Sequence, residues 1–467
     1  MYSDHLHKFN QILPSSNILT DPDITSSFCT DHRNRYHGEA FAVLQPDNVD
    51  AIQKIMRYCH QHHIPVTPQG GNTGLCGGAT PHSSISKQGI ILSLSKLNRL
   101  RNLSYDDNTI TVEAGMILAD LQTEARNAGL YFPLSLASEG SCQIGGNIAC
   151  NAGGVNVVRY GTTRDLVIGL EYVLPTGELI SHLQPLHKNT SGYEMRQIII
   201  GSEGTLAIIT AATLKLFAQP LSILTAWIGI DTIQTAIDLL QRLRDQLSDR
   251  ISSFELISSQ ALKLSSSYSQ LQPPTEAAWH ILLELTDSIP NQNLTDPLIS
   301  VLEQGNWLNT VIAQSETERN QLWKLRENIS EAQRHLGASI KHDIALPIEY
   351  IADFVEHSQQ QLQQAFPHAQ TILFGHLGDG SLHYNVFLGD TLNNDVYQHE
   401  DNINKIVYEC VIKHHGTVAA EHGIGQLKTQ WIPQIRTQSE INWMRIQKQT
   451  LDPHNILNIG KVLPPLP

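Results

Sequence analysis

The chain has 467 residues, 22 of them His, and a formal net charge of −14 from 31 Lys plus Arg against 45 Asp plus Glu. The acidic balance excludes a nucleic-acid-binding surface that works by phosphate contacts, and a hydrophobic fraction of 41% excludes a disordered chain. No apolar run reaches the roughly 20 residues of a transmembrane helix, so none is expected. The length predicts two or three domains.

The N-terminal stretch MYSDHLHKFN has neither the apolar core of a signal peptide nor the arginines of a transit peptide. The six cysteines show no C-x-x-C spacing, which argues against a zinc knuckle or a redox dithiol. We therefore predict free thiols in a reducing cytoplasm. The alternative is a set of disulfides, which suits an oxidising compartment.

The first half reads as mixed α and β structure that begins with a β-α-β unit. Residues 1–35 are expected to form an N-terminal extension. The patterns then predict, in chain order, an apolar strand at 41–44, a helix over 49–62, strands at 64–66, 90–94 and 109–113, a helix over 118–128, and strands at 167–174 and 206–216.

The composition shifts near Gln219-Pro220, and the second half alternates strand-like runs with polar amphipathic helices. This alternation predicts a separate domain in which helices cover an antiparallel sheet. The expected strands are 225–230, 279–285 and 371–375, and the expected helices are 232–247, 316–335 and 395–414. The tail over 436–460 is expected to be helical.

Two glycine clusters carry the first functional signal. Five glycines fall between Gly70 and Gly78, directly after a predicted strand, and a second cluster spans 138–147 and continues at 151–154. Glycines leave backbone N–H groups bare for an anion, and Asn72 and Thr73 add side-chain donors. Two such loops suggest one extended ligand such as a dinucleotide, whereas the alternative is a pair of tight turns. Neither loop fits the Rossmann or P-loop spacing.

A histidine constellation in the second half carries the second signal. His376 and His383 flank a Gly-Asp-Gly turn, and Glu421 and His422 follow further on. Two His and one carboxylate form a common ligand set for a catalytic divalent ion, which leaves His422 free to act as a base. Chance clustering is the alternative, because the chain has 22 His.

Four glycine-rich motifs, in order along the chain, resemble the FAD-binding domain of the vanillyl alcohol oxidase and p-cresol methylhydroxylase (PCMH) superfamily. They are GGNTGL at 70–75, SCQIGGN at 141–147, NAGG at 151–154 and IGSEGTL at 200–206. The resemblance implies an α+β fold: a two-part FAD-binding domain of this type at 36–217, an antiparallel-sheet substrate and metal-binding cap domain at 218–425, and a C-terminal helical segment at 426–467 that returns to the FAD domain. The first loop lacks the His that anchors FAD in some relatives, so we expect non-covalent FAD.

The same resemblance assigns the cofactor-binding residues. They are Gln69, Gly70, Gly71, Asn72, Thr73, Gly74, Leu75, Pro133, Ser138, Ser141, Ile144, Gly145, Gly146, Asn147, Asn151, Gly153, Glu203, Ile208 and Asn458.

The second half resembles the flavin-linked D-2-hydroxyacid dehydrogenase branch, nearest to its D-2-hydroxyglutarate dehydrogenases. The resemblance implies a divalent metal, zinc, bound by His376, His383 and Glu421, with His422 as the catalytic base. It implies substrate contacts from Arg326, Ser330, Lys341, Asn385 and His422. Ser330 replaces the Thr of the nearest relatives and Ile459 replaces a Pro in the closing segment, so the turn there is expected to differ.

These residues imply oxidation of D-2-hydroxyglutarate to 2-oxoglutarate. The metal lowers the pKa of the substrate hydroxyl, His422 takes the hydroxyl proton and the C2 hydride passes to N5 of FAD. An electron-transfer flavoprotein or a quinone is the expected electron acceptor, and a homodimer is a possible assembly.

Two other functions stay open: a D-lactate or glycolate dehydrogenase, and a non-catalytic flavin-binding subunit of an electron-transfer complex. For single residues, Arg326 could instead be a surface helix residue paired with Glu327 or Glu331, and Lys341 could lie in a solvated loop.

Overall fold

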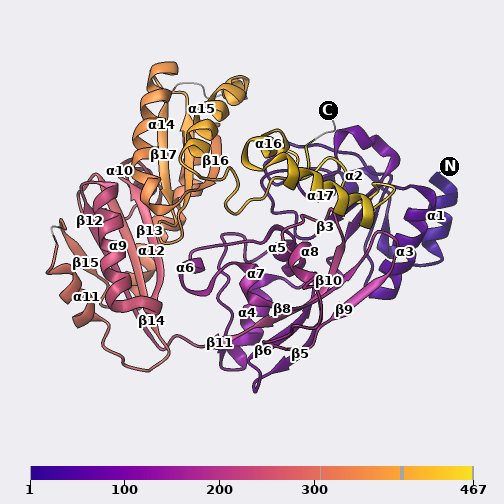
Figure 1. Cartoon of the computed structure of the whole chain (residues 1–467), viewed down its shortest axis with the longest axis horizontal. Coiled ribbons are helices and arrows are strands. Elements are labelled where there is room, and N and C mark those ends of the chain that lie inside the picture. Colours follow the sequence, from indigo (N-terminus) through magenta and orange to yellow (C-terminus); the bar gives the residue numbers. More distant parts are fainter. Residues whose placement is uncertain (1, 306, 390–393, 465–467) are drawn as a thin grey trace. The chain divides into compact units, whose positions relative to one another are not determined.

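The structure is a computed structural model that describes residues 2–305, 307–389 and 394–464. It separates into two compact units (Figure 1). Unit 1 comprises 1–152, 162–218 and 421–467, and unit 2 comprises 153–161 and 219–420. Among the described residues, no helix is long and apolar enough to cross a bilayer.

The first sheet of unit 1 begins with the predicted β-α-β unit. Its strand order is β1-β2-β4-β3, with β2, β4 and β3 parallel; the strands are β1 (Ile18–Leu19), β2 (Ala42–Leu44), β3 (Val66–Gln69) and β4 (Ile90–Ser93). Helix α3 (Val49–His62) connects β2 to β3 and confirms the helix expected there. It begins because the side chain of Asn48 accepts from the backbone N–H of Ala51, and it ends where His63 adopts a left-handed φ of 53°.

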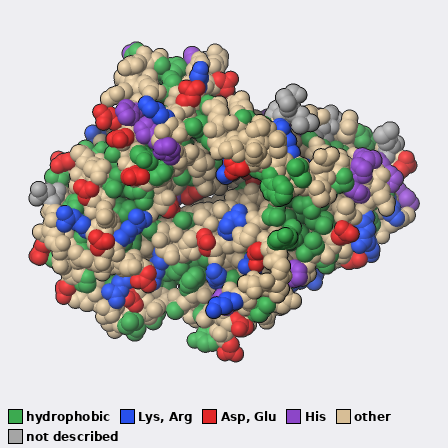
Figure 2. All heavy atoms as spheres, in the orientation of Figure 1, with side chains coloured by type: hydrophobic (Ala, Val, Ile, Leu, Met, Phe, Trp, Pro, Cys, Tyr) green, Lys and Arg blue, Asp and Glu red, His purple; other side chains and the backbone are tan. Residues whose placement is uncertain are grey.

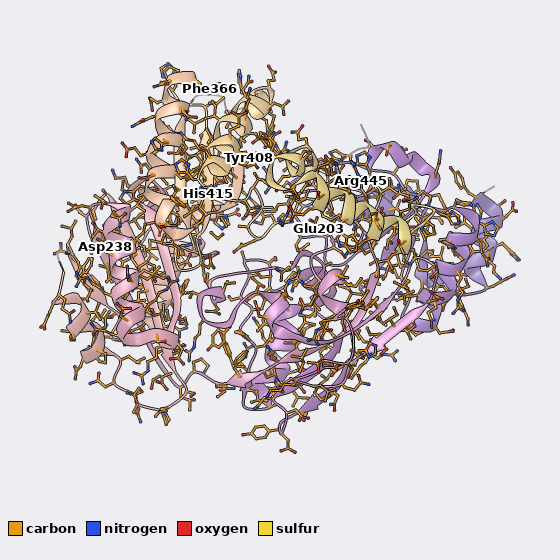
Figure 3. All side chains as sticks on the ribbon, viewed as in Figure 1. Glu203, Asp238, Phe366, Tyr408, His415 and Arg445 are labelled. Atoms are coloured by element: carbon orange, nitrogen blue, oxygen red, sulfur yellow. The ribbon has the colours of Figure 1, made fainter. Side chains whose placement is uncertain are left out.

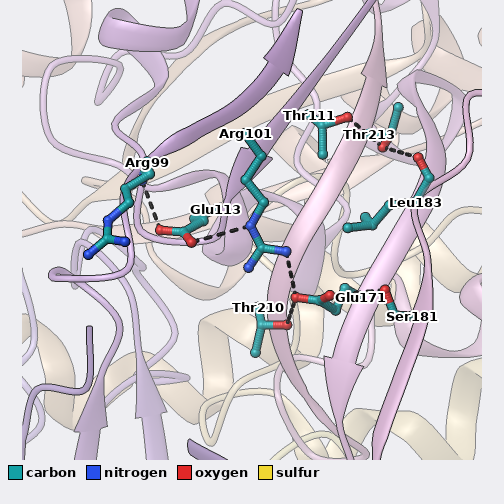
Figure 4. Close-up of polar contacts among 9 residues, drawn as sticks. All are labelled: Arg99, Arg101, Thr111, Glu113, Glu171, Ser181, Leu183, Thr210 and Thr213. Carbon is teal, nitrogen blue, oxygen red and sulfur yellow. Dashed lines mark hydrogen bonds and ion pairs between the residues drawn. The ribbon is translucent and has the colours of Figure 1, made fainter. Parts of the chain in front are cut away.

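The second sheet of unit 1 is antiparallel, in the order β5-β6-β10-β8-β9. Its strands are β5 (Leu100–Ser104), β6 (Thr109–Glu113), β8 (Val167–Val173), β9 (Leu179–His182) and β10 (Ile208–Lys215). The strands expected at 109–113, 167–174 and 206–216 are thus confirmed. Figure 4 shows how the sheet satisfies its buried acids: Arg101 lies between Glu113 (3.2 Å) and Glu171 (2.9 Å), and Thr210 also donates to Glu171.

Shorter elements complete unit 1. The helices are α1 (Tyr2–Asn10), α2 (Pro22–Phe28), α4 (Leu118–Asn127), α5 (Ile144–Cys150), α7 (Thr163–Leu166), α8 (Arg196–Ile199), α16 (Ile432–Ile435) and α17 (Gln438–Leu451), and β7 (Leu130–Tyr131) pairs with β11 (Phe217–Ala218). The helical tail expected at 436–460 is α17 as far as Leu451. Thr437 and Glu440 form a capping box at its start. Lys448 fixes its end by bonding Asp452 and the carbonyls of Thr205 and Leu457.

Unit 2 is built on one antiparallel sheet, as predicted, with the order β15-β12-β14-β13-β17-β18-β16. The strands are β12 (Ser222–Ile230), β13 (Ile251–Ser258), β14 (Trp279–Asp287), β15 (Thr310–Ile312), β16 (Ile340–Ala345), β17 (Gln370–Gly375) and β18 (Ser381–Phe387). Strands β12, β14 and β17 occupy the three predicted strand regions, whereas β13, β15, β16 and β18 were not predicted.

Helices cover both faces of this sheet (Figure 1). The face that holds Trp227, Ile257 and Phe374 packs against α10 (Ser259–Ser269), α12 (Glu316–Glu327) and α13 (Ile329–Ala332). The other helices of the unit are α6 (Val157–Tyr160), α9 (Ile233–Leu247), α11 (Thr295–Leu302), α14 (Ile351–Ala365) and α15 (Glu400–Lys413). The single helix expected over 316–335 is interrupted at Asn328, a residue type that favours helix ends over helix interiors.

All six cysteines are free thiols, as predicted. Figure 2 shows that the excess histidines gather in patches, one of them near the N-terminus. There His5 bonds Tyr58 and stacks edge-on against His62, while His454 contacts His60 and His63. Most of the histidines thus lie outside the constellation singled out from the sequence.

Candidate active site

One face of the unit 2 sheet gathers most of the predicted substrate and metal residues. On the paired strands β16 and β18, Lys341 lies opposite Asn385 and Asp343 lies opposite His383. Directly opposed residues of antiparallel strands point to the same face. We call these four residues the site face. Phe374 of β17 lies opposite His383, so this is the face that α10, α12 and α13 cover.

The turn between β17 and β18 brings the two predicted histidine ligands together. The rings of His376 and His383 lie 5.8 Å apart, and each offers a ligand atom within 4.8 Å of the other. The carbonyl of His376 accepts from the N–H groups of Gly380 and Ser381, and the N–H of Gly378 donates to the carbonyl of Phe254 on β13. The backbone of the turn is therefore fixed to the sheet beside it.

A buried carboxylate joins a predicted metal ligand to the predicted substrate arginine. Glu255 of β13 is 0% exposed; its Oε1 lies 2.6 Å from Nδ1 of His376, and its Oε2 accepts from Arg326 at 2.7 Å. Burial alone raises the pKa of Glu255, but His376 and Arg326 outweigh it and lower the pKa to about 2. The Arg326 guanidinium also lies 4.7 Å from the ring centre of Phe374. Arg326 is thus buried and bonds Glu255, so the alternative that it is a surface helix residue is wrong.

The remaining predicted substrate residues lie on other elements of unit 2. Lys341 lies on β16, which makes the solvated-loop alternative wrong. Asn385 donates to Oε1 of Gln333 at 2.8 Å, and Gln333 is held by the carbonyl of Ile329. Ser330 lies exposed on the short helix α13. A cation, an amide and a hydroxyl therefore come from three neighbouring elements of unit 2.

In unit 1 the two glycine clusters meet. A Cβ on Gly71 would lie 2.1 Å from the carbonyl oxygen of Ser141, so the backbones of the two loops touch and only glycine fits there. A Cβ on Gly74, Gly140 or Gly146 would find no described atom within 4 Å. Two touching loops with open space over bare backbone fit the phosphates of a dinucleotide such as FAD.

Several polar side chains predicted to bind the cofactor instead brace these loops. Gln69 donates to the carbonyls of Phe28 and Ala79, and Asn72 donates to that of Thr30. Asn458 donates to the carbonyls of Gly78 and Glu203, Asn147 donates to Sγ of Cys142, and Asn151 accepts from the N–H of Arg164. The backbone N–H groups of these residues and of the glycines are therefore the main hydrogen-bond donors left for a cofactor. Of the other predicted cofactor residues apart from Glu203, Ile144, Gly145 and Gly146 begin helix α5, Pro133 and Ile208 lie near β7 and at the start of β10, and the rest lie in the loops.

Glu203 has an unexpected role in unit 1 (labelled in Figure 3). Its buried carboxylate accepts from the backbone N–H groups of Ile424 (2.7 Å) and Gly425 (2.8 Å). Burial raises its pKa, although these N–H groups act in the opposite direction. Glu203 therefore fixes the segment that directly follows Glu421 and His422, the predicted third ligand and base.

The sequence reasoning missed Glu255, Asp343 and Gln333. Glu255 is the only charged residue in the strand ISSFELIS at 251–258, and a lone acid in an otherwise uncharged strand was the available signal. Asp343 stands two residues after Lys341, so the two share a strand face, but the strand β16 that places them there was not predicted. Gln333 offered no signal, because its role depends on a contact 52 residues away in sequence.

Two family models match the chain. The model described as "FAD binding domain" covers residues 40–182, and the model described as "FAD linked oxidases, C-terminal domain" covers residues 219–462. The first range holds both glycine clusters, and the second holds the site face with Glu421 and His422.

Curated proteins and solved structures give the same placement. A D-2-hydroxyglutarate dehydrogenase of Xanthomonas citri is 34% identical over 99% of this chain and 97% of its own, and one of Stutzerimonas stutzeri is 32% identical over 98% of both. A structure of p-cresol methylhydroxylase matches with a TM-score of 0.78 at 16% identity, over 98% of this chain and 96% of that one, and so shares the predicted fold. The chain therefore belongs to the FAD-linked oxidase family and is a full-length relative of proteins named D-2-hydroxyglutarate dehydrogenase.

Proposed function

We propose that the protein oxidises D-2-hydroxyglutarate to 2-oxoglutarate with FAD as the hydride acceptor. The observation that carries the proposal is the pairing of Lys341 with Asn385 beside His383, on one face of one sheet. This face offers a cation and an amide donor for a carboxylate next to metal-ligating imidazole. The dehydrogenases of Xanthomonas citri and Stutzerimonas stutzeri, named for this substrate, support the choice.

A dicarboxylate suits the donors of the site face better than a monocarboxylate does. Lys341 gives a point charge, and Asn385 is held by Gln333 with its amide fixed. Ser330 adds a hydroxyl. Arg326 already bonds Glu255 through Nε and Nη2, so its outer N–H groups are the ones left for substrate. We assign the carboxylate remote from C2 to Lys341, Asn385 and Ser330.

The donors around His376 and His383 fit a divalent metal, and we propose zinc. Imidazole nitrogens with a carboxylate are ordinary zinc ligands. Glu421 is proposed as the third ligand, since a carboxylate commonly completes a zinc site that two imidazoles begin.

His422 is proposed as the base that takes the hydroxyl proton. It follows Glu421 directly, and Glu203 holds the backbone two and three residues beyond it, which limits its movement. When bound, the metal supplies a Lewis acid for the substrate hydroxyl and FAD supplies an acceptor for the C2 hydride. We further propose that FAD is held without a covalent bond, that the enzyme is cytoplasmic and that a separate electron carrier reoxidises it.

Anaerobic flavin bleaching tests the proposal. The zinc-loaded yellow protein is mixed with D-2-hydroxyglutarate, its L-enantiomer or D-lactate, and the flavin absorbance is followed. We expect rapid bleaching by D-2-hydroxyglutarate alone. Faster bleaching by D-lactate would transfer the assignment to a lactate dehydrogenase, and no bleaching by any 2-hydroxy acid would remove the enzyme assignment. His422→Ala should slow bleaching while the flavin stays bound.

A further inference from the structure

Glu255 stands at the centre of a three-residue chain inside unit 2. One carboxylate oxygen meets Nδ1 of His376 at 2.6 Å, and the other accepts from Nε and Nη2 of Arg326, each at 2.7 Å. Ser253 Oγ makes a longer contact of 3.4 Å to the first oxygen. The side chains of Glu255 and Arg326 are 0% and 8% exposed, so water does not screen these bonds.

This geometry fixes which nitrogen of His376 is available for a metal. A carboxylate only accepts hydrogen bonds, so the proton between the two groups belongs to Nδ1 of His376. In the neutral ring, Nε2 then carries the lone pair and is the only nitrogen that can bind a cation. The main-chain bonds of the 376–381 turn hold the backbone, but they do not choose this tautomer.

We propose that Glu255 is a positioning residue that serves the metal ligand and the substrate arginine at once. It sets the tautomer and the ring orientation of His376 through one oxygen, and it holds the guanidinium of Arg326 through the other. The two groups are thereby fixed relative to each other by one rigid side chain on a central strand. This inference rests on the proposed metal and substrate roles of His376 and Arg326.

Replacing Glu255 by Gln tests the proposal because it changes very little else. Gln has the same size but only one acceptor oxygen, so it can satisfy one partner and must present an NH₂ group to the other. Arg326 carries a full charge and presents two donors, so we expect the amide oxygen to face Arg326. The NH₂ group then donates to Nδ1 of His376 and moves the ring proton to Nε2, the nitrogen that a metal needs.

The first measurement is zinc affinity, by competition with a chromophoric chelator on the full-length flavoprotein. We expect the zinc Kd of Glu255→Gln to rise about 10- to 100-fold, the usual effect of losing a carboxylate that supports a metal-bound His. The visible spectrum of the cobalt-substituted protein should also change, because the ligand field at His376 changes. A zinc Kd within twofold of wild type would overturn the proposal.

The matched control is Glu284→Gln. Glu284 is also nearly buried, lies on the same sheet face, and accepts from Arg319 of the same helix α12, together with Thr225 and Trp323. It has no His partner in the described contacts, so Glu284→Gln should keep wild-type zinc affinity. An equal loss in both variants would mean that Glu255 acts through general stability, and would overturn the proposal.

Failure of the proposed function gives a different pattern. If wild-type protein and His383→Ala bind zinc equally weakly, the metal assignment itself is wrong. If wild type binds zinc tightly, His383→Ala does not and Glu255→Gln matches wild type, only the role of Glu255 is wrong.

Discussion

Helix α12 makes two arginine–glutamate pairs with the same face of one sheet, and the two pairs serve different ends. Arg319 bonds Glu284 on β14, where Trp323 and Thr225 supply the other donors. Arg326 bonds Glu255 on β13, where His376 and, at a longer distance, Ser253 are the other side-chain donors. The arginines stand seven residues apart, which places them on the same side of the helix.

The two pairs differ in the other residues that each carboxylate contacts. All of the partners of Glu284 are side chains that support the sheet and helix. The partners of Glu255 include His376 and Arg326, a predicted metal ligand and a predicted substrate residue. We call the two regions the supporting pair (Arg319 and Glu284) and the site pair (Arg326 and Glu255). The same Arg–Glu pairing thus supports the fold at Glu284 and the candidate site at Glu255, because the remaining partners of the two carboxylates differ.

The largest expected effect comes from removing a metal ligand beside the site pair. His383→Ala should lower kcat/KM for D-2-hydroxyglutarate about 10³- to 10⁴-fold, because the Lewis acid contributes several kcal/mol to the transition state. Zinc content and steady-state kinetics check this. His280→Asn is the control, since His280 is a buried His on the same sheet face that bonds Trp227 and Thr275. A His383→Ala protein with full zinc would contradict the ligand assignment.

The next largest effect should be on the free energy of unfolding, which should fall more when the site pair is broken than when the supporting pair is broken. Arg326→Ala leaves the buried Glu255 with His376 and a long contact to Ser253 but without its charged partner, a change that costs about 3 to 5 kcal/mol of the free energy of unfolding. The side chain of Arg319 is 33% exposed, so Arg319→Ala should lower the free energy of unfolding by only about 1 kcal/mol. Urea unfolding of both variants measures the difference. Equal losses would show that the site pair is no more sensitive than the supporting pair.

A smaller effect, on KM, is expected when Lys341 of the site face is replaced. Lys341→Met should raise KM for D-2-hydroxyglutarate about 30-fold, because a charged hydrogen bond to a carboxylate contributes about 2 kcal/mol. Arg319→Met should leave KM unchanged. An unchanged KM in the Lys341 variant would place the remote carboxylate of the substrate elsewhere.

The smallest expected effect is the pH dependence of stability that arises from His280, a buried residue near the supporting pair. Burial lowers the pKa of His280 from 6.5 to about 4, so the folded state favours the neutral ring. This contribution to stability is complete above pH 6.5 and is lost as the pH falls toward 4. Between pH 7.5 and 5.5 the loss is about 1.3 kcal/mol. Urea midpoints of wild type and His280→Asn measure it, and parallel pH curves would contradict this pKa.

Much of the fold was readable from the sequence because its signals are local. Strands β8 and β10 are runs of β-branched and apolar residues, and Asn48 marks the start of α3 as a cap. Strand β13 was missed because its Ser and Glu residues hide the apolar pattern of ISSFELIS. The interruption at Asn328 was missed because helical periodicity continues past it.

The site was only partly readable. The motifs placed His376 and His383 together, since a short turn joins the two. Contacts distant in sequence were not readable. Glu255 lies 121 residues before His376, and Glu203 lies 221 residues before Ile424. The side chain of Asn72 was expected to face a ligand, but a carbonyl 42 residues away takes its donor.

The meeting of the two glycine loops has a consequence for saturation mutagenesis. At Gly71 every side chain collides with the backbone of the other loop, so intolerance there reports packing alone. At Gly74, Gly140 and Gly146 the protein leaves room for a methyl group. Any position among these three that rejects alanine would mark a point where the cofactor itself approaches the chain. A mutational map of three glycines would thus serve as a footprint of the flavin nucleotide.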